Sequence, residues 1–255
     1  MKTRNLLNNL VLIALVGILA SACTTVSSSS EIAGDLEGNA VYQGNKARIV
    51  VGRFKCKASN CSNRAANGIG DMLSTSLSNV ENLIVLANQD EVKELAQEIN
   101  MANSGYVEKG SGPQAGLMEG ADIMVIGSIT AFEPDAGAGG GSVGRITTGL
   151  LGDVGISRKV AQLNMDVKLV DIRLRRILVS IPIRVKSSNW GGSVAASHYV
   201  RGVSLGGELG MYANSPMEDA IRAAIAGAVE KVGKKIPPSY YRYKGQGQYQ
   251  QDYRR

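Results

Sequence analysis

The hydrophobic and polar positions after residue 46 follow two different periods. Residues 48–54 contain a short apolar run, Ile49 to Val51, which is typical of a buried strand. Beyond a loop at 55–63, apolar residues recur at three- and four-residue spacing, which predicts a helix with one buried face. The apolar positions of that helix are Ile69, Met72, Leu73, Leu77 and Val80.

A second strand and a second helix follow. Residues 83–86 are all apolar and predict the strand. Asn88, with Glu91 three positions later, has the spacing of a capping box that opens a helix. Residues 121–129 predict a third strand. In the second helix, we expect the residues that face inward to be Val92, Leu95, Ala96 and Ile99.

Glycine and alternation replace this pattern from residue 132 onward. The segment 132–157 is dominated by glycine and small residues, and 161–169 then alternates between apolar and polar positions. After a turn and a returning strand at 177–185, the segment 186–211 is again rich in glycine, and 203–211 alternates. These segments predict two hairpins of membrane-crossing length, and flexible periplasmic loops are the alternative interpretation.

A capped helix closes the domain. Ser215 has the place of an N-cap, Pro216 suits the first helical position, and Glu218 completes a capping box. The segment 237–255 has no apolar period, and we expect it to be disordered. The apolar stripe of the helix, which we expect to pack in the core rather than in a partner's groove, comprises Met217, Ile221, Ala224, Ile225, Ala228, Val229 and Val232.

Residues 1–22 have the organisation of a lipoprotein signal peptide. A basic start is followed by an apolar stretch at 10–20 and by the small residues Ser21 and Ala22. The next residue, Cys23, completes a lipobox, in which its thiol receives a diacylglycerol and becomes the new N-terminus. Cleavage of an ordinary secretory signal is the alternative. Residues 23–46 then predict a lipid anchor and a flexible tether.

Lipid on Cys23 predicts the location of the mature protein. Acyl chains such as palmitate contribute roughly 0.8 kcal/mol per buried methylene, so a multiply acylated cysteine anchors firmly in membrane lipid. Thr24, rather than aspartate, follows the cysteine, as in lipoproteins that Gram-negative bacteria release to the outer membrane. No later segment reaches about 18 uninterrupted apolar residues, so we expect any further membrane crossing to be made by strands.

Composition excludes several classes of function. The chain has 31 glycines but two phenylalanines and one tryptophan, which is unusual for a packed enzyme core. A single histidine, His198, argues against a Ser/His or Cys/His hydrolase, and no phosphate loop is present. We therefore expect no enzyme, no metal and no cofactor beyond the covalent lipid. We read the net charge of +6 as surface charge or attraction to anionic lipid, because exported proteins seldom meet nucleic acid.

Two cysteines remain after lipidation of Cys23. Cys56 and Cys61 lie five positions apart in a predicted loop, and thiols so placed can form a disulfide in an oxidising periplasm. A zinc site is the weaker interpretation, because His198 is far away in sequence.

Several stretches, in this order and spacing, resemble the CsgG family of curli secretion channels, which includes holdfast-attachment lipoproteins. The resemblance covers about residues 47–232. After the lipobox it rests on KARIVVGRF, LIVLANQDEVKELAQE, ADIMVIGSITAFE, VAQLNMDVKLVDIRLRRIL and ELGMYANSPMEDAI.

The resemblance implies a fold and a function. A periplasmic domain of mixed α+β or α/β type spans 47–236, and its two Gly-rich hairpins, near 127–167 and 183–211, contribute to an oligomeric outer-membrane β-barrel. Nine subunits with four strands each would close about 36 strands. Such a pore exports an unfolded or fibre-forming surface protein, as in curli or holdfast assembly, with accessory periplasmic factors. The alternative function is a lipid-anchored periplasmic scaffold that binds an envelope complex without forming a pore.

The resemblance also assigns a constriction to the loop after the first strand. In the curli channels this loop carries a tyrosine, followed four and five places later by an asparagine and a phenylalanine. Here the matching residues are Cys56, Asn60 and Cys61. Both aromatic positions are therefore cysteine, and a disulfide across them would leave a polar orifice around Asn60 in place of an aromatic collar.

Overall fold

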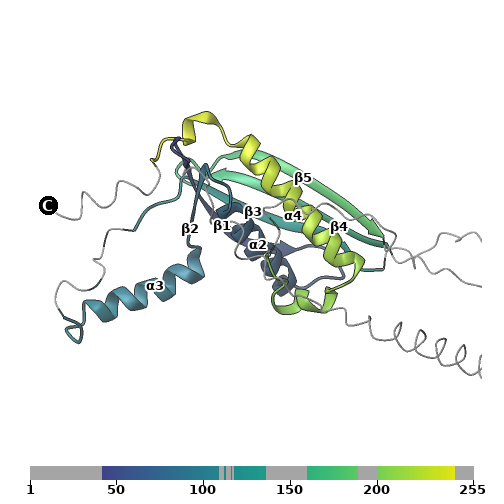
Figure 1. Cartoon of the computed structure of the whole chain (residues 1–255), viewed down its shortest axis with the longest axis horizontal. Helices are drawn as coiled ribbons and strands as arrows, with labels where there is room; N and C mark the ends of the chain where they lie inside the picture. Colours follow the sequence, from purple (N-terminus) through teal and green to yellow (C-terminus); the bar gives the residue numbers. More distant parts are fainter. Residues whose placement is uncertain are drawn as a thin grey trace, which may run out of the picture. The chain divides into compact units, whose positions relative to one another are not determined.

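The computed structural model describes residues 42–108, 112, 116, 118–135, 160–188, 200 and 202–244. Within these residues, five strands form one sheet in the order β2-β1-β3-β4-β5 (Figure 1). The strands are β1 (Ala47–Cys56), β2 (Leu83–Leu86), β3 (Ile123–Glu133), β4 (Val160–Asp171) and β5 (Ile177–Ser188). The helices are α2 (Asn63–Ser78), α3 (Gln89–Ala102) and α4 (Pro216–Lys235), with two short 3₁₀ helices, η1 (Gly207–Tyr212) and η2 (Pro238–Tyr240).

The sheet contains both parallel and antiparallel strand pairs. β1 is parallel to both β2 and β3, whereas β4 is antiparallel to both β3 and β5. The crossovers from β1 to β2 and from β2 to β3 carry α2 and α3. The predicted fold class is confirmed at this level. The predicted barrel strands are not, because residues 136–159 and 189–199 lie outside the described residues.

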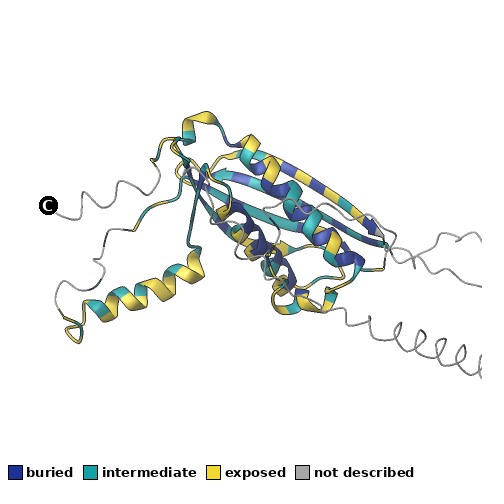
Figure 2. Cartoon of the chain, in the orientation of Figure 1, coloured by how far each residue is buried: buried dark blue, intermediate teal, exposed yellow. Residues whose placement is uncertain are grey.

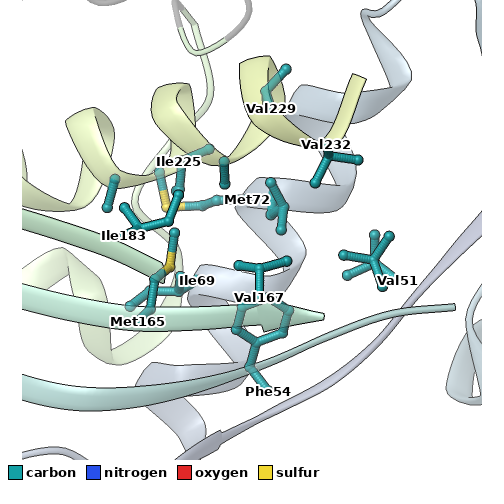
Figure 3. Close-up of a cluster of buried hydrophobic side chains, with 14 of the residues drawn as sticks. Val51, Phe54, Ile69, Met72, Met165, Val167, Ile183, Ile225, Val229 and Val232 are labelled. Atoms are coloured by element: carbon teal, nitrogen blue, oxygen red, sulfur yellow. The ribbon is translucent and has the colours of Figure 1, made fainter. Parts of the chain in front are cut away.

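One face of the sheet holds the core. α2 packs on β1, and α4 packs on β4 and β5, so both helices cover the same face, which we call the inner face. Figure 3 shows side chains of the strands and of both helices meeting in this layer, among them Phe54, Met72, Val167 and Ile225. The stripe predicted for the last helix is confirmed as core, because all seven of its apolar residues are buried. In the first helix the four stripe residues from Ile69 to Leu77 are buried too, whereas Val80 lies beyond the end of α2 and is partly buried.

The alternating segment 161–169 belongs to this core and not to a membrane hairpin. Its apolar residues, from Ala161 to Leu169, point into the inner face and are at most 1% exposed. Alternation arises wherever one sheet face is covered and the other is not, and here α4 is the cover. The interpretation of 161–169 as membrane-crossing is therefore wrong.

The second alternating segment is also different from the prediction. No strand forms in the described residues of 202–211; instead, η1 begins at Gly207. Val203 and Leu209 are buried in the core, while Met211 is 71% exposed. Glycines at 202 and 207 adopt positive φ angles of 80° and 58°, which allows turns that an extended strand would not contain.

Helix caps are partly as predicted. At α3 the capping box is complete, because the Asn88 side chain accepts from the N–H of Glu91 and the Glu91 side chain accepts from the N–H of Asn88. At α4, Ser215 makes no side-chain cap; its hydroxyl donates to the Tyr212 carbonyl oxygen at 2.5 Å. Glu218 instead accepts from the N–H of Asn214 at 2.7 Å, so the capping box predicted there is wrong.

The chain remains ordered beyond the prolines at 237 and 238. Lys46 and Tyr243 form an antiparallel bridge beside the start of β1. The Tyr240 hydroxyl donates to Asp171 at 2.5 Å, and Arg242 pairs with Asp122 at 2.5 Å. The expectation that disorder starts at residue 237 is therefore wrong for 237–244, and residues 245–255 lie outside the described part.

Candidate functional site

A disulfide between Cys56 and Cys61 closes the loop that joins β1 to α2. The two Cα atoms lie 6.0 Å apart, a separation typical of disulfide bonds. Cys56 is the last residue of β1, and Cys61 precedes the N-cap of α2 by one position. The bond therefore joins the end of a central strand to the start of a core helix, and it restrains residues 57–60 between them.

Two further contacts hold the base of this disulfide loop. The Lys57 N–H donates to the Ile129 carbonyl oxygen of β3 at 2.8 Å, and the Cys56 N–H donates to the side-chain oxygen of Asn63 at 3.0 Å. These contacts satisfy backbone donors that the end of β1 would otherwise leave unpaired. The tip of the loop thus projects from a rigid base.

The exposed surface of the disulfide loop is polar. Lys57, Ser59 and Asn60 are exposed, whereas both cysteines are partly buried against the core. No aromatic residue lies between positions 55 and 63. Lys55 and Arg64 add positive charge on either side of the loop, and the Arg64 side chain is 87% exposed. The loop therefore presents hydrogen-bonding groups and cations on its exposed side, and no apolar collar.

Glu208 connects this region to η1, a contact that the sequence pattern did not reveal. The Ser62 side chain caps α2 by accepting from the Ala65 N–H at 3.0 Å, and its hydroxyl donates to Glu208. Glu208 also lies 3.6 Å from Arg64. Because 146 residues separate Ser62 from Glu208, no local spacing marks the pair.

A cavity of about 790 Å³ lies beside the disulfide loop, between α2 and the segment 202–208. Its lining is mixed in character, with Arg64, Asp71 and Glu208 among the charged residues and Met72 and Val203 among the apolar ones. Burial raises the pKa of Asp71, and the carboxylates of Glu91 and Asp90 raise it further. The described residues contain no group of three metal-binding side chains, so this cavity has no metal-ligand set within them.

The strands that lead to both Gly-rich segments end at one end of the sheet. Glu133, the last residue of β3, pairs with Gln162 near the start of β4. Val160, which opens β4, pairs with Ser188, the last residue of β5. Cys56, the last residue of β1, pairs with Ile129 on β3 and lies toward the same end. The Gly-rich segments and the disulfide loop therefore leave the sheet from the same end.

Cys23, the predicted lipid attachment point, lies outside the described residues. The single histidine, His198, lies outside them as well. Among the helices that the structure describes, none combines the length and apolar content needed to span a membrane.

Comparison with known proteins assigns the family. The family model described as "Curli production assembly/transport component CsgG" matches residues 35–237, which is most of the chain. The chain therefore belongs to the CsgG family. No curated protein matches it in sequence.

Several solved structures resemble this chain at low similarity. A Xanthomonas campestris protein is 9% identical, covers 76% of this chain and 85% of its own, and has a TM-score of 0.38. The PelC dodecamer of Paraburkholderia phytofirmans is 10% identical over 74% of this chain and 89% of its own, with a TM-score of 0.33. A Neisseria meningitidis lipoprotein is 13% identical over 58% of this chain and 88% of its own, with a TM-score of 0.34.

Proposed function

We propose that this protein is an outer-membrane lipoprotein whose copies assemble into a ring-shaped pore for export of an unfolded or fibre-forming surface polypeptide. Membership of a family of assembly and transport components supports the general role. The lipobox at Cys23 supports the membrane anchor. Accessory periplasmic factors and the number of subunits, nine by resemblance to the curli channels, are part of the proposal.

The observation that carries the proposal is the common exit of both Gly-rich segments from one end of the sheet. Segment 136–159 connects β3 to β4, and segment 189–199 follows β5. The strand ends from which they leave, at Glu133, Val160 and Ser188, lie at one end of the sheet. Two hairpins from one protomer could therefore enter a bilayer together. Because open strand edges in hydrocarbon cost several kcal/mol for each unpaired group, the hairpins must pair with those of neighbouring protomers.

In this pore the disulfide loop forms the constriction. Lys57, Ser59 and Asn60 would line it, and the Cys56–Cys61 bond would fix its width. A polar and cationic constriction would let a polypeptide pass without binding its apolar side chains. We infer that passage is passive, since no residue pattern for nucleotide binding is present in the sequence.

The first test is detergent extraction of outer membranes, followed by electron microscopy and single-channel recording in planar bilayers. We expect rings and discrete conductance steps. A monodisperse monomer without conductance would support the alternative scaffold function instead, because a scaffold does not need to oligomerise.

The second test places a charge at the constriction. Asn60→Glu adds one carboxylate per protomer at the loop tip, so it should raise the cation selectivity of the channel. Gln97→Glu makes the same change on α3, away from the loop, and should leave selectivity unaltered. Equal selectivity in both variants would remove the disulfide loop from the conduction path.

A further inference from the structure

α3 leaves the sheet edge as a projecting helix with a fixed first turn. It begins three residues after Leu86, the last residue of β2, and its capping box ties Asn88 to Glu91. The Arg53 guanidinium of β1 holds Asp90 through contacts of 2.6, 2.7 and 3.1 Å. The direction of the helix is therefore set by the sheet from which it emerges.

The apolar side of α3 has no cover within the described part of the chain. Val92, Leu95, Ala96 and Ile99 recur at helical spacing and form what we call the α3 stripe. None of the residues of α3 is buried, and Leu95 is 49% exposed (Figure 2). The expectation that these four residues face the protomer's own core is therefore wrong. An amphipathic helix in water with its apolar side open is a typical partner-binding element.

A second apolar surface lies open on the same chain. α2 and α4 pack on the inner face of the sheet, and no helix of the described residues packs on the opposite face, which we call the outer face. Side chains of β2, β1 and β3 make an apolar patch there. A Cβ built at Gly52 would lie 3.0 Å from the Ile126 side chain and 3.3 Å from that of Met124, so these two side chains lean together over the glycine. The patch comprises Ile84, Leu86, Val50, Met124 and Ile126, all partly exposed.

The two surfaces have complementary charge. α3 carries four carboxylates, Asp90, Glu91, Glu94 and Glu98, and one cation, Lys93. The outer face carries more cations than carboxylates, with Asp166 and Glu133 as its acidic residues. Its cations include Lys168, which pairs with Ile126 of the patch, Lys55, which pairs with Ser128 of β3, and Arg184 and Lys186 on β5. Complementary potentials of this kind fix the orientation of a contact and favour one partner over others.

We propose that the α3 stripe of one protomer packs on the outer face of a second copy of this chain. This inference rests on the proposed oligomeric pore and names the surfaces that would join its subunits. The contact would cover both apolar surfaces at once and would bring the acidic helix to the basic strands. Since α3 and the outer face are different surfaces, the contact is head-to-tail, and repetition of a head-to-tail contact closes a ring when the rotation permits.

The proposal is tested with lipidated full-length protein in detergent. Leu95→Glu puts a carboxylate in the centre of the α3 stripe, and we expect it to weaken association at least about 30-fold, as loss of an interface anchor does. Gln97→Glu introduces the same side chain on the opposite side of the same helix and should leave rings intact. Mass photometry and electron microscopy give the oligomeric state, and circular dichroism shows whether each variant is folded.

A disulfide cross-link then tests the pairing itself. Leu95→Cys combined with Met124→Cys should give a ladder of covalent oligomers on non-reducing gels. Gln97→Cys with Met124→Cys is the matched control, because residue 97 would face away from the neighbour, and we expect it to give no ladder.

The outcomes separate this inference from the proposed function. If the wild-type protein is a monomer, both fail. Suppose that the wild type forms conducting rings, that the Leu95→Glu variant forms rings equally well, and that the cysteine pair gives no ladder. In that case only the proposed interface is wrong. Cross-linking of Leu95→Cys to a different envelope protein, without a ladder, would also overturn it.

Discussion

The packing of Phe54 explains why two elements of this fold require glycine. Its buried ring lies between Gly70 of α2 and Gly127 of β3. A Cβ built at Gly127 would lie 2.1 Å from the ring, and one at Gly70 would lie 3.0 Å from it. Both glycines therefore let a helix and a strand approach the same aromatic side chain, which is one of the two phenylalanines in the chain.

Gly127→Ala should lower the free energy of unfolding by about 2 kcal/mol, because the added methyl group displaces a ring that the core surrounds. Urea unfolding of the purified domain measures the change. Gly120→Ala is the control, since a Cβ there would meet nothing within 4 Å. Equal stability of the two variants would show that the Phe54 ring moves aside freely.

Asp171 makes the stability of the fold depend on pH in the acidic range. The hydrogen bond from the Tyr240 hydroxyl, reinforced by the Leu174 N–H, lowers the pKa of this buried carboxyl. A lowered folded-state pKa stabilises the fold fully above the ordinary unfolded value of about 3.9. That stabilisation is lost as the pH falls through the lower value of the folded state.

We therefore expect Asp171→Asn to be less stable than the wild type at neutral pH, with the difference shrinking below about pH 4. Tyr240→Phe should behave similarly, because it removes the larger cause of the pKa shift. Tyr241→Phe removes a hydroxyl that donates to the Gly233 carbonyl oxygen and should leave the pH profile unchanged. The measurement is the urea midpoint of each variant across the pH range. A difference between Asp171→Asn and the wild type that stays constant with pH would contradict the role given to Asp171.

At the scale of the elements, sequence periodicity predicts which helices and strands form, but not what packs against their apolar faces. The strand at 83–86, the capped start of α3 and the core stripe of α4 all follow from local spacing. Spacing alone assigned 161–169 to a membrane and the α3 stripe to the core, and the structure reverses both. An apolar period indicates that one face of an element is removed from water. Tertiary contacts decide whether that face packs against the same chain, lipid or a partner.

The disulfide loop is the element whose stability can be tested most directly. Closing so short a loop contributes about 2 kcal/mol in the chain-entropy description. Cys56→Ser combined with Cys61→Ser should lose about this amount in urea unfolding. Dithiothreitol should destabilise the wild type to the same extent and leave the double variant unaffected; an effect on both would show that the reductant acts elsewhere.

For the molecule as a whole, the candidate site was predictable where its residues are close in sequence and not where they are distant. The five-residue spacing of Cys56 and Cys61 predicts a disulfide across the loop. The contacts of Glu208 with Ser62 and Arg64 join segments far apart in the chain, so only the fold reveals them. Only the fold reveals the contacts of residues 237–244 as well, a segment that we call the tail. Its tyrosines and its arginine have no apolar period, but they contact residues on, or next to, three different strands.

The tail acts as a clamp across the sheet, and its removal should show this. Residues 242 and 243 make three main-chain hydrogen bonds with Lys46, and Arg242 also pairs with Asp122 beside β3. At roughly 1 kcal/mol for each main-chain bond, deletion of residues 237–255 should cost about 3 kcal/mol of unfolding free energy.

Deletion of residues 245–255 is the matched truncation, because it spares every one of these contacts and should leave stability unchanged. Urea unfolding compares the two truncated proteins with the full chain. Because the clamp joins the start of β1 to β3 and, through Tyr240, to the end of β4, its loss should also expose the ends of all three strands to hydrogen exchange. Equal stability and equal exchange in both truncations would mean that the sheet holds its ends without the tail.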